Sequence, residues 1–165
     1  MDPALTELKA LLLAAPGRPR LAVAESMTGG RLQARITEIS GASSFFLGGV
    51  TAYAVAQKVA LLGVDAAHAA AVNCVSERVA GEMACGACRL FGADLALATT
   101  GYAEPSPADG VVKPFAWVAL AAASGGVPRV LSTLRVDCAG TMRTEAQAKV
   151  ADAALTLLSE RLRAG

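Results

Sequence analysis

The sequence contains few histidines, which commonly bind metals, and few aromatic side chains, which stack on bases. His68 is the only histidine among 165 residues, and aromatic side chains make up 4% of the chain. Fifteen basic and fourteen acidic residues give a formal net charge of +1, and neither sign dominates a long segment. Nucleic-acid binding usually needs a positive surface and often aromatic stacking platforms, so we expect no nucleic-acid partner.

Long apolar runs are also missing. The chain is 54% hydrophobic with a mean hydropathy of +0.47, yet no run approaches the roughly 18 residues that indicate a membrane span. The N-terminal segment has no basic leader and instead predicts a helix over Pro3–Ala15 with Asp2 as its N-cap. We expect a soluble cytoplasmic protein with no membrane partner, folded as a single domain over residues 1–165.

The four cysteines do not have the spacing of a metal site. Cys85 and Cys88 form a C-x-x-C inside a helical pattern, without a second pair, and Cys74 and Cys138 lie in apolar segments. We interpret all four as small, reduced core residues, and we expect no bound metal.

A short apolar run that ends in hydroxyl groups and glycines is the most informative stretch. Leu21–Ala24 predicts a buried strand, Glu25–Gly30 a polar turn, and Thr28–Ile39 a helix. This arrangement gathers backbone N–H groups and a positive helix end, where an anion or an oxyanion can bind. Ser26 stands where a nucleophile could lie, but hydroxyl residues before helices are also common N-caps. The glycines match neither the phosphate loop nor the dinucleotide fingerprint.

A second apolar run, Asp94–Gly101, ends in the same way, at Thr99–Gly101. Ligands of parallel sheets gather at the carboxyl ends of strands, so we expect both polar turns at one mouth. The tight turn between Phe115–Ala123 and Arg129–Val136 demands an antiparallel pair. The alternation predicts a three-layer α/β/α sandwich with a mostly parallel five-stranded mixed sheet and one antiparallel strand. The other predicted elements are a strand over Gly49–Tyr53 and helices over Gln57–Leu62, Asp65–Ala71, Ser76–Phe91 and Thr144–Arg163.

Short motifs occur in a fixed order along nearly the whole chain. They are Ala24–Gly30, Ser43, Phe46–Tyr53, Lys58, Leu62–Val64, Val75–Glu77, Phe91–Asp94, Thr100–Gly101, Lys113–Pro114 and Gly140–Arg143. No single motif is decisive, but the ordered set resembles the CinA C-terminal domain family, whose members include the nicotinamide mononucleotide deamidases.

The resemblance implies hydrolysis of the carboxamide of nicotinamide mononucleotide to the acid and ammonia, a step of pyridine nucleotide salvage. It implies no metal or cofactor, a small-molecule nucleotide substrate and a homo-oligomer. By position, Ser26 corresponds to the nucleophile, Lys58 to the base and Tyr53 to a residue of the same site. No serine–histidine triad is evident, and a lysine can act as a base if burial or neighbouring positive charge lowers its pKa.

The expected substrate-binding groups surround these three residues. The backbone N–H groups at the predicted helix start are candidates for holding an oxyanion, and the second rim and nearby donors are candidates for the rest of the substrate, including its phosphate. Each also has a plain structural interpretation as a cap, a turn or a solvated side chain. The candidates are Thr28, Gly29, Gly30, Ser43, Thr100, Gly101 and Arg143.

The chain departs from the family pattern around substrate recognition. In the loop Tyr102–Asp109, the family's Gly-Pro becomes Glu104-Pro105, which adds negative charge near an expected phosphate. The family's Gly-Thr after Lys113–Pro114 becomes Ala116–Trp117. Two alternatives to a nucleotide amidase therefore remain open. One is an amidase for a different, less phosphorylated pyridine carboxamide, and the other is a catalytically silent protein that binds a nucleotide or a protein partner.

Overall fold

The computed structural model describes residues 2–165 and confirms the predicted α/β/α fold. Its five-stranded sheet has the order β2-β1-β3-β4-β5. Strand β1 is parallel to β2 and β3, and β4 is antiparallel to β3 and β5, so four strands run one way and β4 the other. The elements are α1 (Pro3–Ala14), β1 (Leu21–Glu25), α2 (Arg31–Thr37), the 3₁₀ turn η1 (Ala42–Ser44), β2 (Phe46–Thr51), α3 (Val55–Leu62), α4 (Ala66–Ala71), α5 (Glu77–Phe91), β3 (Leu95–Gly101), the 3₁₀ turn η2 (Pro107–Asp109), β4 (Phe115–Ser124), β5 (Val127–Asp137) and α6 (Arg143–Ala164).

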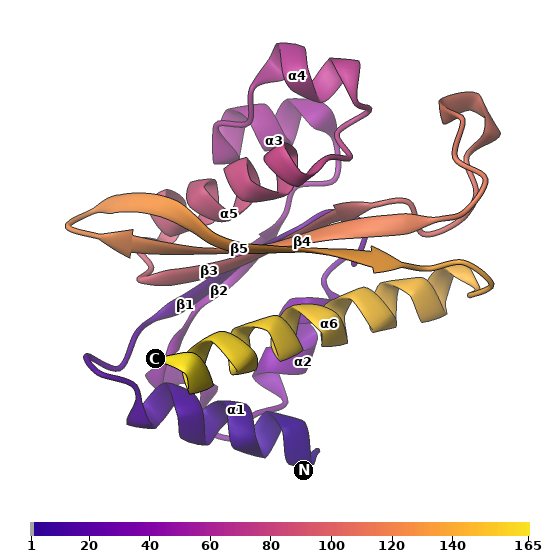
Figure 1. The fold of residues 1–165 in the computed structure, drawn as a ribbon. Helices are drawn as coiled ribbons and strands as arrows, with labels where there is room; N and C mark the ends of the chain where they lie inside the picture. Colours follow the sequence, from indigo (N-terminus) through magenta and orange to yellow (C-terminus); the bar gives the residue numbers. More distant parts are fainter. Residues whose placement is uncertain (1) are drawn as a thin grey trace.

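Helices cover both faces of the sheet (Figure 1), with α1, α2 and α6 on one side and α3, α4 and α5 on the other. The first side has a core of leucine, isoleucine and valine, whereas the second is rich in alanine. At Gly86 of α5, an added Cβ would lie 2.2 Å from the backbone oxygen of Leu62 in α3. The missing side chain therefore sets how closely α5 approaches α3. No helix within residues 2–165 is both long and apolar enough to cross a bilayer.

Strand β1 ends in a carboxylate that is completely buried. Glu25 accepts hydrogen bonds from the Thr28 hydroxyl (2.6 Å) and from the backbone N–H groups of Gly30, Leu32 and Gln33 (3.0, 3.0 and 2.9 Å). A helix start leaves such N–H groups without intrahelical partners, and here a side chain from the preceding strand supplies the acceptor. Glu25 therefore fixes the direction in which the chain leaves the sheet.

Several predicted boundaries differ from the structure by one or two residues, and two elements differ by more. The helix expected over Thr28–Ile39 begins at Arg31, because Gly29 and Gly30 adopt left-handed φ values of 61° and 98°. The strand expected over Gly49–Tyr53 is Phe46–Thr51, because that segment pairs in parallel with the whole of β1 from Leu21 to Glu25. Tyr53 consequently lies beyond the strand.

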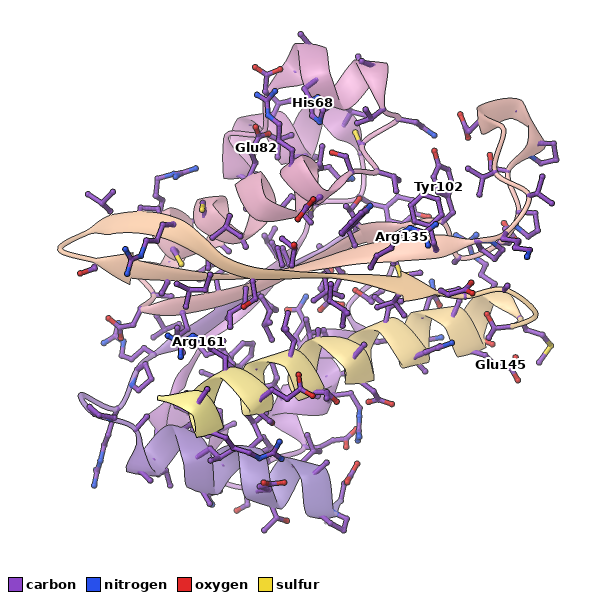
Figure 2. All side chains as sticks on the ribbon, in the orientation of Figure 1. His68, Glu82, Tyr102, Arg135, Glu145 and Arg161 are labelled. Atoms are coloured by element: carbon purple, nitrogen blue, oxygen red, sulfur yellow. The ribbon has the colours of Figure 1, made fainter. Side chains whose placement is uncertain are left out.

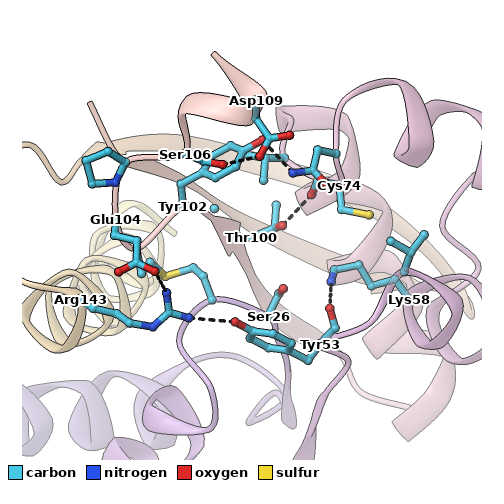
Figure 3. A pocket seen from close by; sticks show the side chains of 17 residues that line it. Ser26, Tyr53, Lys58, Cys74, Thr100, Tyr102, Glu104, Ser106, Asp109 and Arg143 are labelled. Carbon is cyan, nitrogen blue, oxygen red and sulfur yellow. Dashed lines mark hydrogen bonds and ion pairs between the residues drawn. The ribbon is translucent and has the colours of Figure 1, made fainter. Parts of the chain in front are cut away.

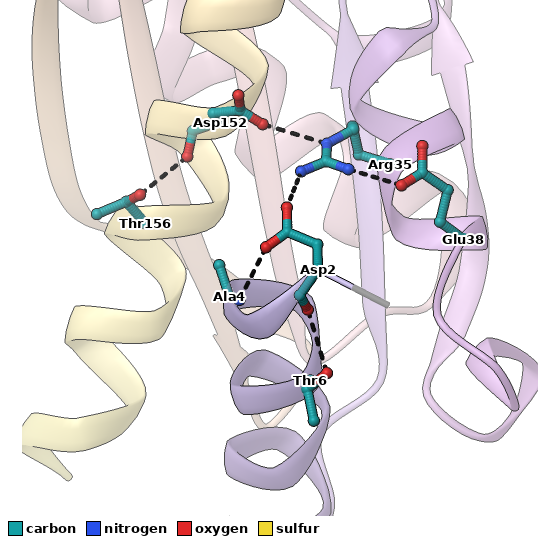
Figure 4. A network of polar contacts seen from close by, with 7 residues as sticks. All are labelled: Asp2, Ala4, Thr6, Arg35, Glu38, Asp152 and Thr156. Carbon is teal, nitrogen blue, oxygen red and sulfur yellow. Dashed lines mark hydrogen bonds and ion pairs between the residues drawn. The ribbon is translucent and has the colours of Figure 1, made fainter.

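A single arginine connects three helices on the α6 side (Figure 4). Arg35 of α2 contacts Asp2 at the start of α1 (2.5 Å), Glu38 at the C-terminal end of α2 (2.6 Å) and Asp152 of α6 (3.2 Å). Asp2 is also the N-cap of α1, as predicted, and accepts a hydrogen bond from Ala4 N–H at 2.9 Å. The hydrogen bond from Arg35 lowers the pKa of the Asp2 carboxyl group. This network holds the first helix against the last one.

Candidate active site

Buried polar side chains gather at the carboxyl ends of β1 and β3. Within residues 2–165, seven polar or charged residues are buried, and Ser159 is the only one of them elsewhere. The two strand ends are directly joined: Ser26 N–H donates to Thr99 O (3.0 Å), and the hydroxyls of Thr28 and Thr99 lie 2.7 Å apart. The two polar turns therefore meet at one mouth, as the sequence predicts. The six buried polar residues there are Glu25, Ser26, Thr28, Lys58, Thr99 and Thr100.

A cavity of about 320 Å³ opens beside these strand ends (Figure 3). It is formed by the turn after β1, the segment Tyr53–Lys58, the connection between α4 and α5, the loop after β3, and the start of α6. Six of the sequence-predicted site residues line it. They are Ser26, Tyr53, Lys58, Thr100, Gly101 and Arg143.

Lys58 is almost completely buried, with 2% of its surface exposed. Its ammonium nitrogen donates to the backbone oxygen of Tyr53 at 2.7 Å, and it forms no ion pair within residues 2–165. Burial disfavours the charged form of the amine and lowers the pKa of Lys58. The geometry therefore provides an amine with a reduced affinity for its proton, pointing into the cavity (Figure 3).

Ser26 is the first residue after β1, and 8% of its surface is exposed. Figure 3 draws no hydrogen bond from its hydroxyl to the other side chains that line the cavity. The hydroxyl is therefore free to meet a ligand on the wall that also holds Lys58, although no hydrogen bond joins these two side chains among residues 2–165.

The rim of the cavity is a chain of polar contacts. Arg143, the first residue of α6, donates to the hydroxyl of Tyr53 (3.0 Å) and to the carboxylate of Glu104 (2.7 Å). Tyr53 is 59% exposed, so its ring lies at the entrance and not in the core. The arginine thus links the segment after β2 to the loop after β3.

One wall of the cavity comes from the connection between α4 and α5. Asn73 and Cys74 both have left-handed backbone conformations, with φ values of 47° and 59°. Such conformations cost about 1–3 kcal/mol each in non-glycine residues and persist only where contacts enforce them. Here the hydroxyl of Thr100 donates to Cys74 O (2.7 Å), and the amide of Asn73 donates to the hydroxyl of Tyr102 (3.2 Å). Sequence reasoning missed this wall.

Comparison with known proteins identifies the family. The profile of the CinA C-terminal domain matches residues 5–162. The chain belongs to the CinA C-terminal domain family. A CinA-like protein of Picosynechococcus is 41% identical over 139 residues, which are 73% of this chain and 33% of that protein. One from Frankia casuarinae is 45% identical over 109 residues, which are 66% of this chain and 25% of that protein. The chain thus spans a quarter to a third of the length of these curated relatives.

Solved structures agree with this assignment over the whole chain. The competence damage-inducible protein A of Klebsiella pneumoniae superposes with a TM-score of 0.84 at 33% identity, covering 97% of this chain and 95% of that one. A second CinA superfamily protein from the same species gives a TM-score of 0.86 at 31% identity, covering 98% and 97%. This CinA-family chain thus covers nearly the whole length of each of these two structures, unlike that of the longer curated relatives.

Four of the substrate-binding residues expected from the sequence do not line the cavity of this CinA domain. The N–H of Gly29 donates to Ser26 O (3.1 Å), that of Gly30 to Glu25, and the Thr28 hydroxyl is bonded to Glu25 and Thr99. The N–H groups of both glycines therefore already have acceptors within the domain. Ser43 precedes β2 and lies at the opposite end of that strand, about 20 Å from the mouth for a six-residue strand.

The histidine and the C-x-x-C pair of this CinA domain lie away from the cavity. His68 of α4 contacts the hydroxyl of Ser76 at 2.9 Å, on the outer helical layer (Figure 2). Cys85 and Cys88 are free thiols in α5, and burial raises the pKa of Cys88 to about 11. Among residues 2–165, no three His, Cys, Asp or Glu side chains gather where they could hold a metal ion.

Proposed function

We propose that this CinA-family chain is an amidohydrolase that converts the carboxamide of nicotinamide mononucleotide to the acid and releases ammonia. The observation that carries the proposal is the buried Lys58, which shares a cavity with a free serine hydroxyl at the end of a central strand. A buried lysine without a carboxylate partner destabilises a fold. Its lowered pKa increases the fraction of neutral amine, which is the form that can take a proton from serine.

The proposed reaction has two halves. In the first, the oxygen of Ser26 attacks the carboxamide carbon while the neutral amine of Lys58 takes the hydroxyl proton. The C–N bond then breaks, the Lys58 ammonium protonates the departing nitrogen, and ammonia leaves an ester on Ser26. In the second half, Lys58 takes a proton from water, the resulting hydroxide attacks the ester, and the C–O bond to Ser26 breaks. The serine oxygen regains the proton, and the acid is released.

The tetrahedral oxyanion in each half needs hydrogen-bond donors. The N–H groups of Met27 and Thr28 follow Ser26 directly, and neither donates to an acceptor within residues 2–165. Met27 also lines the cavity. We assign oxyanion stabilisation to the Met27 N–H group, since Met27 lines the cavity and Thr28 does not, in place of the glycine N–H groups that are bonded to Ser26 and Glu25.

Ammonia release tests the proposal directly. The wild-type chain is expected to release ammonia from nicotinamide mononucleotide, whereas Ser26→Ala and Lys58→Met each lose at least about a thousandfold in kcat. Lys149→Met is the matched control, because Lys149 is exposed on α6 and donates only to Asp137 O. Turnover that survives Lys58→Met would remove lysine as the base. Tight nucleotide binding without ammonia release from any pyridine carboxamide would favour the silent binding protein instead.

A further inference from the structure

The charged groups around the cavity leave little positive charge for a phosphate. Its lining contains two cationic side chains, Lys58 and Arg143, and two carboxylates, Glu104 and Asp109. The formal charges cancel when Lys58 is protonated, and they sum to −1 when it is neutral. A dianionic phosphate would therefore meet a neutral or negative wall, which does not favour it.

The more exposed of the two cations is already paired. Arg143 donates from one terminal nitrogen to Glu104 and from the other to the Tyr53 hydroxyl, as Figure 3 shows. Arginine binds phosphate best through two parallel N–H bonds, and here each terminal nitrogen already donates one of its two N–H groups to another side chain. A phosphate at this rim must displace the carboxylate of Glu104 or bind beside it against its charge.

The polar side chains of the neighbouring loops also have partners. The hydroxyl of Thr100 donates to Cys74 O (2.7 Å), and that of Ser106 donates to the Asp109 carboxylate (2.5 Å). Their protons are thus directed away from an incoming anion. Ribose hydroxyls differ from a phosphate in this respect, because each can donate to a carboxylate as well as accept. The loop after β3 is better equipped for a sugar than for a phosphate.

The pyridine ring of the proposed substrate adds a further charge argument. A nicotinamide ring attached to ribose through its nitrogen is a permanent cation, which carboxylates and the faces of tyrosine rings attract. Tyr53, Tyr102 and Glu104 all line the cavity. Its volume of about 320 Å³ is at the small end of the range for ligand sites.

We infer that the site prefers the unphosphorylated nucleoside, nicotinamide riboside, over the nucleotide, and that Glu104 sets this preference through its ion pair with Arg143. The inference rests on the proposed amidase function and changes only the phosphorylation state of the substrate. Glu104 acts as a specificity-determining residue that competes with a phosphate for the guanidinium group.

The test compares kcat/KM for nicotinamide riboside and nicotinamide mononucleotide, by ammonia release, in the wild type and in Glu104→Gln. The wild type should favour the riboside. The variant removes one negative charge from the wall that a phosphate would face, and for a dianion about 6 Å away this corresponds to a rise of about tenfold in kcat/KM for the nucleotide. The gain should lie in KM and shrink at high salt, whereas kcat/KM for the riboside should not rise, because its cationic ring loses one attracting carboxylate. Glu160→Gln is the matched control, since Glu160 is exposed near the far end of α6.

The outcomes separate this inference from the proposed function. A wild type that favours the nucleotide overturns the inference and leaves the amidase intact. The inference is also overturned, with the amidase proposal intact, if the ratio of the two kcat/KM values in Glu104→Gln stays within about twofold of the wild-type ratio. Ammonia from neither substrate overturns the amidase proposal itself, and the inference with it. A tenfold change of the ratio in Glu104→Gln but not in Glu160→Gln supports the assignment of Glu104.

Discussion

Replacing Glu25 by glutamine tests how the turn that carries Ser26 is held in place. The buried carboxylate receives three hydrogen bonds on one oxygen, from Thr28, Gly30 and Leu32, and one on the other oxygen, from Gln33 N–H. Glutamine keeps one carbonyl oxygen, which can accept the three hydrogen bonds from Thr28, Gly30 and Leu32. Its amide nitrogen then faces the N–H of Gln33, donor against donor, and that N–H is left without an acceptor.

The cost of Glu25→Gln follows from these bonds. A hydrogen bond to a charged acceptor contributes about 1.5–3 kcal/mol, and a buried donor left without a partner costs about 1–3 kcal/mol. Loss of one bond and weakening of the other three should lower the free energy of unfolding by about 2–4 kcal/mol. For a chain of 165 residues, each kcal/mol corresponds to about 2–4 °C in Tm, which gives a decrease of about 4–16 °C.

Thermal and urea unfolding followed by circular dichroism measure this effect. Glu160→Gln makes the same chemical change on the surface and should stay within about 0.5 kcal/mol of the wild type. Because Ser26 directly follows Glu25, we also expect kcat to fall in Glu25→Gln. A decrease in Tm of less than about 2 °C would refute the reasoning, since it would mean that the four hydrogen bonds do not hold the start of α2.

Three further predictions concern the second helical layer. Lys58→Met should raise Tm at neutral pH. Because burial lowers the folded-state pKa of Lys58, the wild type should become more stable as the pH rises toward the ordinary pKa of lysine. The Tm of the variant should not show this rise with pH. Gly86→Ala should lower the free energy of unfolding by about 2–3 kcal/mol in urea titrations, because its Cβ would lie 2.2 Å from Leu62 O; an unobstructed helical site would gain about 1 kcal/mol. Cys88 is buried, and burial raises its pKa to about 11, so it should react with a thiol reagent at neutral pH only as fast as the domain opens. Rapid labelling, followed by absorbance, would contradict its burial.

The fold could be predicted because its elements have strong local signals. Alternating apolar strands and capped helices predict the layers, and the short Ser124–Gly126 connection predicts the antiparallel hairpin. The errors occur where pairing or a distant side chain overrides the local pattern. Glycines 48 and 49 are poor strand formers, yet they belong to β2 because β1 lies alongside them. The start of α2 is set by left-handed glycines and by Glu25.

The site could be predicted only in part. The meeting of Ser26 with Thr99–Gly101 follows from the geometry of parallel strands, whereas Lys58 was suggested only by the family resemblance. A lysine on a short helix is usually solvated, and nothing in the local sequence indicates that the fold buries this one. The wall at Asn73–Val75 depends on contacts across the cavity to Thr100 and Tyr102, which are absent from local patterns. The one local hint is Asn73, a residue type that tolerates left-handed backbone.

Glu25 and Lys58, which are both completely or almost completely buried, differ in the hydrogen-bond partners that the fold gives them. Glu25 has four donors around its carboxylate, so each of its oxygens has hydrogen-bond partners. Lys58 has one carbonyl acceptor and no carboxylate, so the surrounding structure disfavours its ionised form. Both residues flank the same serine turn, yet only Glu25 contributes to the stability of that turn. A side chain that the fold leaves destabilised beside a cavity is explained more readily by proton transfer than by packing, and this contrast makes Lys58 the first residue to substitute.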